Sequence, residues 1–423
     1  MILQRVRYKD LESWSVKFLI NNAFLNSKFP LKKLGDILQP VNDVIEKTKY
    51  NGKFEIVKKI SFDKEKIELR SEKKTGMDLY KVYSDNLLIS NINFHQGAVA
   101  FNRFNKVIVS STHYQPYNVN FNLVLKDYLI LVLKSRKYKK YINLKKTEGI
   151  KTELKFKHIK DFKIPLPDIN IQKKLIEKYK KIQQKLRELK EEYPKLLREF
   201  EKNLFIVKYS QNKSLLRRVK YKDLENWSVK SILGEDINYN PIYPLVKLGE
   251  ILTRDKTQIE IQDNIEYKRV TIKLYNRGIF LRDQKFGKDI GTKKQFIIKK
   301  GQFLLSKIDA RNGAFGIVAD ELDGSIVTSD FLAFDFTKKM YPEYLSFLVS
   351  TKSFSKLVEI QSKGTTGRKR VKENEFLNIK IPLPDISIQK KLVQSLKTNL
   401  KEQKYLEKEL KNVLEEFERE IFE

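Results

Sequence analysis

The chain repeats one stretch almost unchanged: Lys163-Ile164-Pro165-Leu166-Pro167-Asp168-Ile169-Asn170-Ile171-Gln172-Lys173-Lys174-Leu175 returns at positions 380–392 with one change, Asn170 to Ser387. Nearer the start, residues 5–17 return at 218–230 with eleven of thirteen positions identical. The offset between matching positions grows only from 213 to 217 residues along the chain. The chain is therefore a fused dimer of itself, and we expect pseudo-two-fold symmetry.

The likeness between the repeats is concentrated at their ends. The interiors, roughly residues 40–160 and 254–377, keep only scattered matches. Nearly identical ends imply the same structural role in both copies. Diverged interiors imply that each half contacts something different, and duplex DNA is the commonest target with two similar halves.

Each repeat closes with a heptad pattern that predicts a long helix. Apolar residues spaced alternately four and three apart form an a/d seam in each copy. The two helices are expected to pair as an antiparallel coiled coil. The predicted seam consists of Leu175, Tyr179, Ile182, Leu186 and Leu189 in the first helix, and Leu392, Leu396, Leu406, Leu410 and Val413 in the second.

Three residues qualify this helical prediction. Asn399 and Gln403 occupy seam positions, where they either fix the register at a cost in stability or face solvent at a splayed end. Pro194 lies inside the first heptad run and has no N–H group to donate. It should kink or break that helix near Glu191.

The fold class predicted is mixed α+β: two similar globular domains joined by two long helices. Strands are expected near 54–60, 86–92, 106–110, 295–299 and 302–307. Amphipathic helices are expected over 122–141 and 342–360. The predicted divisions are 1–28 and 213–242 for the repeated conserved segment, 29–167 and 243–384 for the globular domains, and 168–212 and 385–423 for the helices.

The charge balance points to a polyanionic partner. There are 85 Lys and Arg residues against 53 Asp and Glu, a net charge of +32. Nucleic acid is the first partner this implies, acidic membranes the second and an acidic protein the third; a general lysine bias is the alternative. No apolar run approaches the ~20 residues of a membrane span, so a cytoplasmic protein with no membrane partner is expected.

The sequence offers no convincing catalytic site. With no cysteine, thiolate catalysis and cysteine-based zinc sites are excluded. Asn240-Pro241-Ile242-Tyr243 only approximates an adenine-methyltransferase signature, and no glycine-rich cofactor loop accompanies it. Pro167-Asp168 with Glu188-Leu189-Lys190 mimics a nuclease pattern, but its second part lies in the heptad run. We therefore predict no catalytic residue, no metal and no cofactor.

Polar and basic residues of the interiors are candidates for DNA contacts, because such side chains bind phosphates and base edges. The segment 364–370 combines glycine, threonine and basic residues, and its composition favours a DNA contact over the alternative of a flexible basic turn. The candidates of the first half are Asn93, His95, Gln96, His113, Tyr114, Lys145 and Lys146. Those of the second are Lys293, Lys294, Lys307, Arg311, Asn312, Thr365, Thr366, Arg368, Lys369 and Arg370.

The arrangement resembles the specificity (S) subunits of type I restriction-modification enzymes. The likeness is carried by the Leu-Gly-Asp/Glu-Ile turns at 34–37 and 248–251, by residues 304–316 with their partner 89–98, and by the Ile-Pro-Leu-Pro segments before Gln172 and Gln389. The family usually has proline where Asp168 and Asp385 stand, and often glutamate where Ile171 and Ile388 stand. The likeness covers the whole chain in family order.

The resemblance implies that two target recognition domains each read half of a bipartite, asymmetric DNA site. It also implies that the helices set the spacing, and that two methyltransferase (M) subunits and the restriction (R) subunits bind this non-catalytic chain in the complex. Extrusion of the target base would then be the work of the M subunits. The rivals are a stand-alone DNA-modifying or DNA-cleaving enzyme with fused recognition domains, and a coiled-coil scaffold whose charge keeps it dissolved. RNA binding has less support, because no RNA-module motif is visible.

Overall fold

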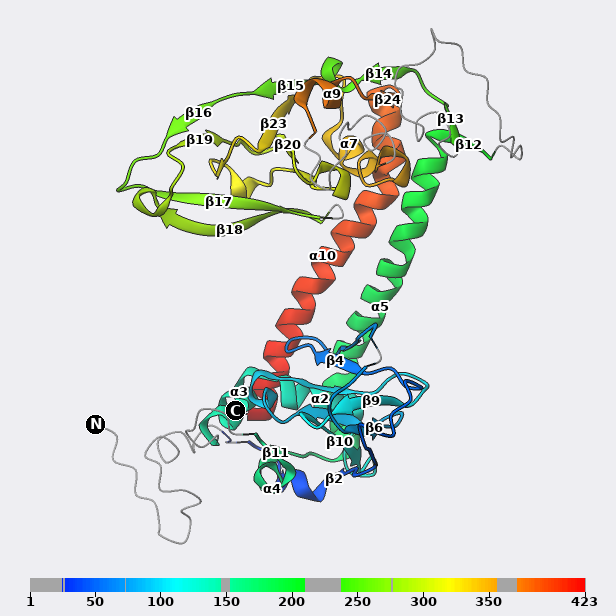
Figure 1. Cartoon of the computed structure of the whole chain (residues 1–423), viewed down its shortest axis with the longest axis vertical. Coiled ribbons are helices and arrows are strands. Elements are labelled where there is room, and N and C mark those ends of the chain that lie inside the picture. The colour runs from blue at the N-terminus through cyan, green and yellow to red at the C-terminus, as the bar shows by residue number, and fades with distance from the viewer. Residues whose placement is uncertain are drawn as a thin grey trace. The chain divides into compact units, whose positions relative to one another are not determined.

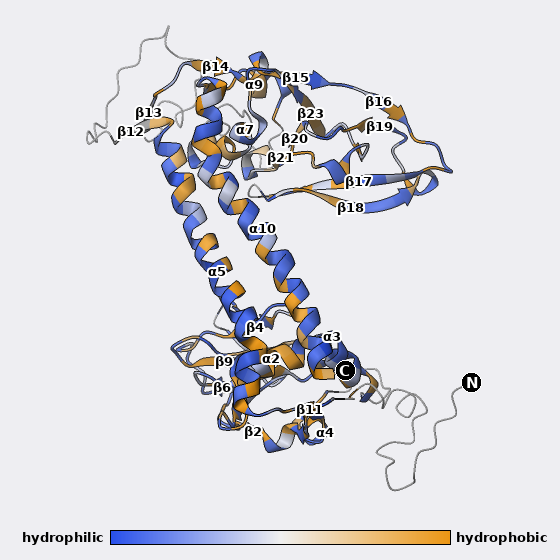
Figure 2. Ribbon diagram, turned by 180° about the vertical axis from the view of Figure 1, so that it is seen from behind, coloured by the Kyte–Doolittle hydropathy of each residue, from blue (hydrophilic) through white to orange (hydrophobic). Residues whose placement is uncertain are grey.

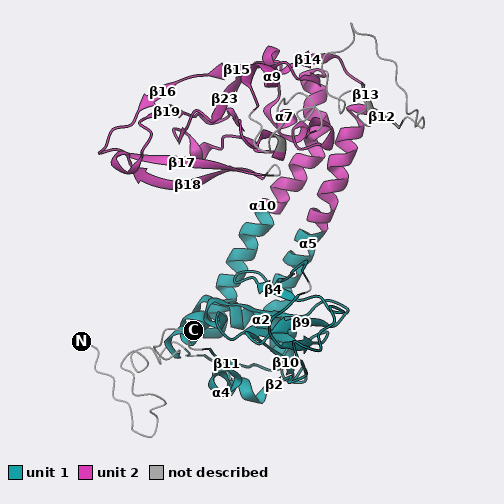
Figure 3. Cartoon of the chain, in the orientation of Figure 1, with its two compact units in different colours: residues 1–187, 405–423 teal, residues 188–404 magenta. Residues whose placement is uncertain are grey.

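The computed structural model describes residues 25, 27–72, 74–145, 153–209, 237–274, 277–355 and 371–422. The chain divides into two compact units, residues 1–187 with 405–423 and residues 188–404 (Figure 3). The first unit holds the sheets of the first repeat, and the second holds those of the second repeat. Both units also contain part of each long helix, so each unit draws on both halves of the sequence.

The first unit is built on a four-stranded sheet, with smaller sheets beside it (Figure 1). The main sheet has the order β2 (Leu38–Pro40), β10 (Tyr114–Val119), β7 (Leu87–Ser90), β8 (Val99–Phe101). The smaller sheets are β3 (Val44–Ile45), β6 (Leu79–Val82), β9 (Ile108–Ser111); β4 (Val57–Ile60), β5 (Ile67–Leu69); and β1 (Leu31–Lys33), β11 (Lys163–Pro165). The short helices are α2 (Lys126–Lys134), α3 (Arg136–Lys145) and α4 (Phe156–Ile159).

The second unit repeats this plan. Its four-stranded sheet has the order β15 (Leu252–Asp255), β23 (Phe331–Phe336), β20 (Phe303–Ser306), β21 (Phe315–Ile317). The other sheets are β16 (Gln258–Glu260), β19 (Lys294–Ile297), β22 (Ile326–Val327), β17 (Glu266–Lys273), β18 (Gly278–Phe286); β14 (Leu245–Lys247), β24 (Lys380–Pro382); and β12 (Phe205–Tyr209), β13 (Ile237–Pro241). Its short helices are α7 (Pro342–Leu348) and α9 (Glu373–Leu377).

The strand order of the two units matches even where their sequences have diverged. If the four strands of each main sheet are numbered along the chain, both sheets have the spatial order first, fourth, second, third. In both units a parallel pairing links a hairpin, β4–β5 or β17–β18, to another strand. Ile56, directly before β4, pairs with Val109 of β9, and Arg269 of β17 pairs with Ile326 of β22. The predicted mixed α and β class is confirmed, with two similar domains. The hairpins differ in length, since β17–β18 is longer than β4–β5.

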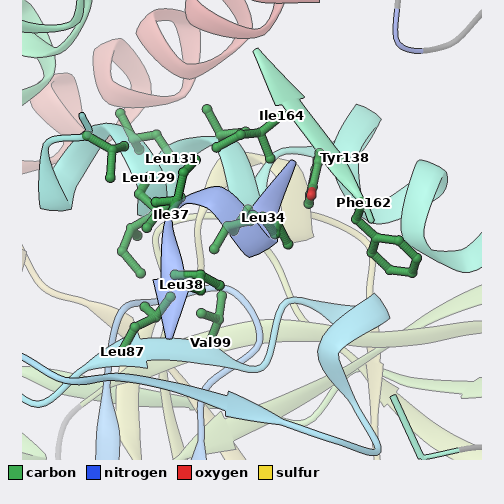
Figure 4. Close-up of a cluster of buried hydrophobic side chains, with 14 of the residues drawn as sticks. Leu34, Ile37, Leu38, Leu87, Val99, Leu129, Leu131, Tyr138, Phe162 and Ile164 are labelled. Carbon is green, nitrogen blue, oxygen red and sulfur yellow. The ribbon is translucent and has the colours of Figure 1, made fainter. Parts of the chain in front are cut away.

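The conserved Leu-Gly-Asp/Glu-Ile turn anchors the core of each unit. Leu34 is fully buried, and Figure 4 shows it among core side chains that include Leu129 and Ile164. The Leu34 amide donates to the Phe162 carbonyl over 2.7 Å, and the matching Leu248 amide donates to Ile379 over 2.9 Å. The repeated motif therefore closes each domain by joining its first strand to its last.

The helix expected over 122–141 is wrong as a single element. Ser135 is extended (φ −60°, ψ 151°) and separates α2 from α3. Its hydroxyl donates to the Val132 carbonyl over 2.7 Å and accepts the Tyr138 amide over 3.2 Å. A serine that ends one helix and caps the next satisfies backbone groups at both termini, which an apolar periodicity does not reveal.

Both long helices form. The first, α5 (Ile169–Lys202), has 34 residues, and the second, α10 (Ile386–Phe422), has 37. Figure 2 shows hydrophobic positions recurring along both between hydrophilic ones. The predicted break at Pro194 is wrong, because α5 continues through that residue for two further turns. Packing of the apolar face outweighs the loss of one backbone donor.

The helices run antiparallel within each unit. In the first unit Lys178 of α5 lies 3.4 Å from Glu416 of α10. In the second, the Asn399 side chain donates to the Leu189 carbonyl over 3.1 Å and to the Glu192 carboxylate over 2.9 Å. Of the predicted seam residues, Ile182, Leu186, Leu189, Leu396, Leu406 and Val413 are buried. Their interlocking as a supercoiled seam stays a prediction.

One glutamine on each helix binds it to the globular domain that precedes it in the sequence. Gln172 is fully buried, and its amide group donates to the carbonyls of Leu123 (2.9 Å) and Pro167 (2.8 Å) and accepts the Leu125 amide (2.9 Å). Gln389 makes the same three bonds, to Lys339 (2.9 Å), Pro384 (2.8 Å) and Tyr341 (2.8 Å). The duplication therefore extends to individual hydrogen bonds.

Asn399 is only 4% exposed, so the solvent-facing interpretation is wrong for this residue. Gln403 supports it, donating to the Asn399 side-chain oxygen over 2.6 Å. The first helix has Ile182 and Leu186 at the matching positions. The polar layer is therefore a feature of one half only.

Replacing Asn399 and Gln403 together with leucine is expected to raise the free energy of unfolding of the second unit by about 1–2 kcal/mol, because buried polar seam residues lower coiled-coil stability. Urea denaturation of the full chain measures the change. The matched control is Ile182→Asn with Leu186→Gln, which should lower stability. A less stable leucine variant would show that the polar layer contributes more through its bonds than it costs in desolvation.

Candidate nucleic-acid interface

The same turn follows the third strand of both main sheets. In the first unit, residues 93–97 join β7 to β8, and in the second, residues 309–313 join β20 to β21. Their backbones match closely: Asn93 has φ −113° and ψ 20°, and Asp309 has φ −114° and ψ 15°. Each turn ends on a left-handed glycine, Gly97 (φ 91°) and Gly313 (φ 73°), a conformation that glycine adopts readily. We call these two segments the recognition turns.

Two further segments are bound to the base of each recognition turn. The Asn91 amide donates to the His113 carbonyl over 2.8 Å, which brings the β9–β10 connection alongside. The Lys307 amide donates to the Asp330 carbonyl over the same distance. A second segment is bound at the same residues: the Leu154 amide donates to the Asn91 carbonyl (2.7 Å), and the Val371 amide donates to the Lys307 carbonyl (2.9 Å).

The predicted residues of the first half largely gather here. Asn93, His95 and Gln96 belong to the recognition turn, with Gln96 exposed. His113 lies in the adjoining connection, its Nδ1 3.2 Å from a Glu153 carboxylate oxygen. Tyr114 pairs with Ser90 at the end of β7. The structure therefore brings five of the seven first-half candidates to one edge of the sheet.

Tyr114 keeps its proton at this edge. Burial raises the pKa of its hydroxyl above the ordinary value, because the charged phenolate is poorly solvated there. A neutral phenol can both donate and accept a hydrogen bond.

The second unit brings fewer of its candidates together. Lys307 lies at the base of the recognition turn and is half-buried, and Asn312 is exposed within it. Arg311 belongs to the same turn. Thr365, Thr366, Arg368, Lys369 and Arg370, like Lys146 of the first half, lie outside the described residues. Val371, the next described residue in the sequence, is bound to Lys307 at the base of the turn.

Three candidates lie away from the recognition turns in the chain. Lys145 ends α3, with its ammonium 5.2 Å from the Tyr141 ring centre. Lys293 is bound to the Asp263 carboxylate (2.5 Å) and the Gly287 carbonyl (2.8 Å). Lys294 begins β19 and is paired across the sheet with Glu260. A DNA contact by any of them stays a prediction.

The sequence pattern missed one neighbour of the first recognition turn. A Cβ atom on Gly97 would lie 2.8 Å from the Phe62 carbonyl, so the β4–β5 connection lies directly against this turn. Phe62 is 41% exposed. The available signal was weak: a lysine, Lys134, directly after the apolar run at 129–133.

Within the described ranges, no three histidine or carboxylate side chains are grouped as a metal site would require. None of the helices in that part of the chain combines the length and hydrophobicity needed to cross a membrane.

Residues 243–416 match the family described as the type I restriction modification DNA specificity domain. This stretch contains the second recognition turn and the whole main sheet of the second unit. The predicted resemblance to type I specificity subunits is confirmed. The first half has the same strand order as this stretch and the same glutamine bonds.

Solved structures similar to the chain include the S subunit of a type I system from M. genitalium, at 14% identity and TM-score 0.47, covering 94% of this chain and 97% of that one. Another is the HsdS subunit from Thermoanaerobacter tengcongensis (14%, TM-score 0.31, 92% and 94%). A third comes from work on assembly and conformational transition of the type I R-M system (13%, TM-score 0.41, 92% and 98%). No curated protein matches the chain.

Proposed function

We propose that the chain is the non-catalytic specificity subunit of a type I restriction-modification complex, and that each unit reads one half of a bipartite, asymmetric DNA site. One observation carries the proposal: the recognition turns share a backbone but not side chains. Asn93-Phe94-His95-Gln96 stands where the other turn has Asp309-Ala310-Arg311-Asn312. Side chains with different hydrogen-bonding groups select different base edges, so one frame reads two different sequences.

The overall charge supports double-stranded DNA as the ligand. A net charge of +32 favours a polyanion whatever its sequence, while the turns supply selectivity. Two methyltransferase (M) subunits and the restriction (R) subunits are the proposed protein partners, and the cytoplasm is the proposed location. Catalysis would then belong to the partners rather than to this chain.

Selection from a pool of randomised 40-base-pair duplexes by the purified full chain tests this function. Sequencing of the retained DNA is expected to give two short, different base sequences at a fixed separation. We call each of these half-site sequences a word. A single continuous word, or no enrichment, would contradict the proposal. The chain alone is expected not to bind S-adenosylmethionine, and binding measured by calorimetry would favour the stand-alone enzyme instead.

We also propose that α5 and α10 set the gap between the two words. Inserting one heptad after Glu191 and another after Lys408, which are matching positions, lengthens both helices by about 10 Å. The gap in the selected sequence should grow by about three base pairs while the words stay the same. A heptad inserted into only one helix is the control and should disrupt binding, because the antiparallel contacts lose their register. An unchanged gap in the double insertion would contradict the role of the helices as a ruler.

A further inference from the structure

Lys134, the last residue of α2, binds three backbone carbonyls at once. Its ammonium group donates to Gly97 over 2.7 Å, to Ser61 over 2.9 Å and to Phe62 over 3.3 Å. Gly97 ends the first recognition turn, and the other two residues begin the β4–β5 connection. One side chain therefore joins three elements that are distant in sequence.

The contact is close and charge-assisted. Gly97 is held against Phe62 with no room for a side chain, since a Cβ atom would lie 2.8 Å from the Phe62 carbonyl. Three carbonyl oxygens directed at one point repel each other unless a cation lies between them. Bonds from an ammonium group are stronger than those between neutral groups, so removing the charge should loosen the turn and the connection together.

The matching position of the second unit does not carry this arrangement. The hydroxyls of Tyr128 and Tyr344 donate to the equivalent carbonyls of Pro165 (2.9 Å) and Pro382 (2.7 Å), which aligns the two helices. The position matching Lys134 is then Ser350, whose hydroxyl donates to Ser346 in its own helix over 2.9 Å. The lysine contact is therefore specific to the first unit.

We propose that Lys134 is a positioning residue for DNA reading by the first unit: it clamps the β4–β5 connection onto the recognition turn, so that both present their side chains to the first half-site. This inference rests on the proposed function. It adds the connection, with its exposed Phe62, to the reading surface of one half only. An aromatic side chain beside a reading turn can stack on or wedge between bases.

The clamp should respond to pH. Burial, helped by the charge of Lys139 on α3, lowers the pKa of Lys134 to about 8, while Glu65 and Asp63 of the connection act in the opposite direction. The other titratable group of the turn is His95. Above pH 8 Lys134 becomes a neutral amine, which has only two N–H donors for the three carbonyls of Gly97, Ser61 and Phe62.

The effect on stability has the opposite sign. The unfolded lysine keeps its proton to about pH 10.4. The unfolded chain therefore binds more protons between pH 8 and that value, and this group's contribution to the free energy of unfolding rises with pH. Loss of reading together with a gain in stability would separate a positioning role from general structural damage.

The test repeats the duplex selection with Lys134→Met, Lys134→Arg and wild type at pH 7 and pH 9. Wild type at pH 9, and Lys134→Met at both pH values, should lose one word and keep the other. Affinity for the wild-type sequence should fall about ten- to hundredfold, as expected for lost base contacts. Lys134→Arg should keep both words at pH 9, because guanidinium stays charged. Lys140→Met, an exposed lysine on α3, is the matched control and should match wild type.

Each outcome decides the inference. If wild type selects two words and Lys134→Met keeps both, or loses both, the positioning role is wrong. If wild type selects no bipartite sequence, the proposed function itself fails. Should Lys134→Met not fold, the pH dependence of wild type, with the second word as internal reference, still tests the clamp.

Discussion

Replacing Gln172 with alanine is expected to lower the free energy of unfolding of the first unit by about 3–5 kcal/mol, because three buried backbone partners would each lose a hydrogen bond worth about 1–3 kcal/mol when left unsatisfied. The side chain is fully buried between the start of α5 and the segment before α2. Urea denaturation followed by circular dichroism measures the loss.

The duplication supplies an internal control. Gln389→Ala removes bonds of the same lengths to within 0.1 Å and should cost the second unit the same amount. Gln184→Ala, exposed on α5, should change stability little. Losses below about 1 kcal/mol for both buried glutamines would show that the junction is not what holds the helices to the domains.

Replacing Phe417 with alanine is the second change with a large expected effect, a loss of about 3–5 kcal/mol from the first unit. Phe417 lies near the end of α10, yet its ring packs 5.8 Å from that of Tyr128 in α2 and is 4% exposed. The cavity would open in the core of the recognition domain at the opposite end of the sequence. DNA selection by this variant should weaken for one word more than for the other.

Phe200→Ala is the symmetric counterpart. Phe200 ends α5 and packs 5.7 Å from Tyr344 in the second unit, so the same loss should appear there. Tyr405→Ala provides the control on α10, because Tyr405 is 63% exposed. Equal stabilities of the Phe417 and Tyr405 variants would contradict a shared core between the domain and the far helix.

These contacts belong to a reciprocal exchange between the halves. The Arg136 amide at the start of α3 donates to Glu418 of α10 over 2.6 Å, and the Ser353 amide donates to Glu201 of α5 over 2.7 Å. Each domain thus binds the start of its own helix and the end of the other. The repeat predicted symmetry, but no spacing in the sequence indicated which domain each helix end completes.

The candidate site shows the same division between local and distant information. Asn93, His95 and Gln96 share a turn because they are neighbours in sequence, and the Gly97 that ends it was visible in the pattern. Lys134 contacts this turn across 37 residues and the Ser61 carbonyl across 73. Separations of this kind carry no periodicity, so a sequence pattern could not link them. Ser135 was missed for a related reason. In the sequence, a serine that caps a helix looks like any other polar residue between apolar ones.

The sequence by itself determined the duplication and the two long helices. The helices depend on hydrogen bonds and apolar spacing within a few residues. The duplication follows because identical residues adopt the same local geometry in both copies. Only the tertiary structure decided that Asn399 is buried, that α5 passes through Pro194, that Gln172 and Phe417 are buried in the first unit, and that Lys134 joins the turn to the β4–β5 connection. Those outcomes depend on which surfaces become buried against one another, and burial is a property of the packed chain rather than of any segment.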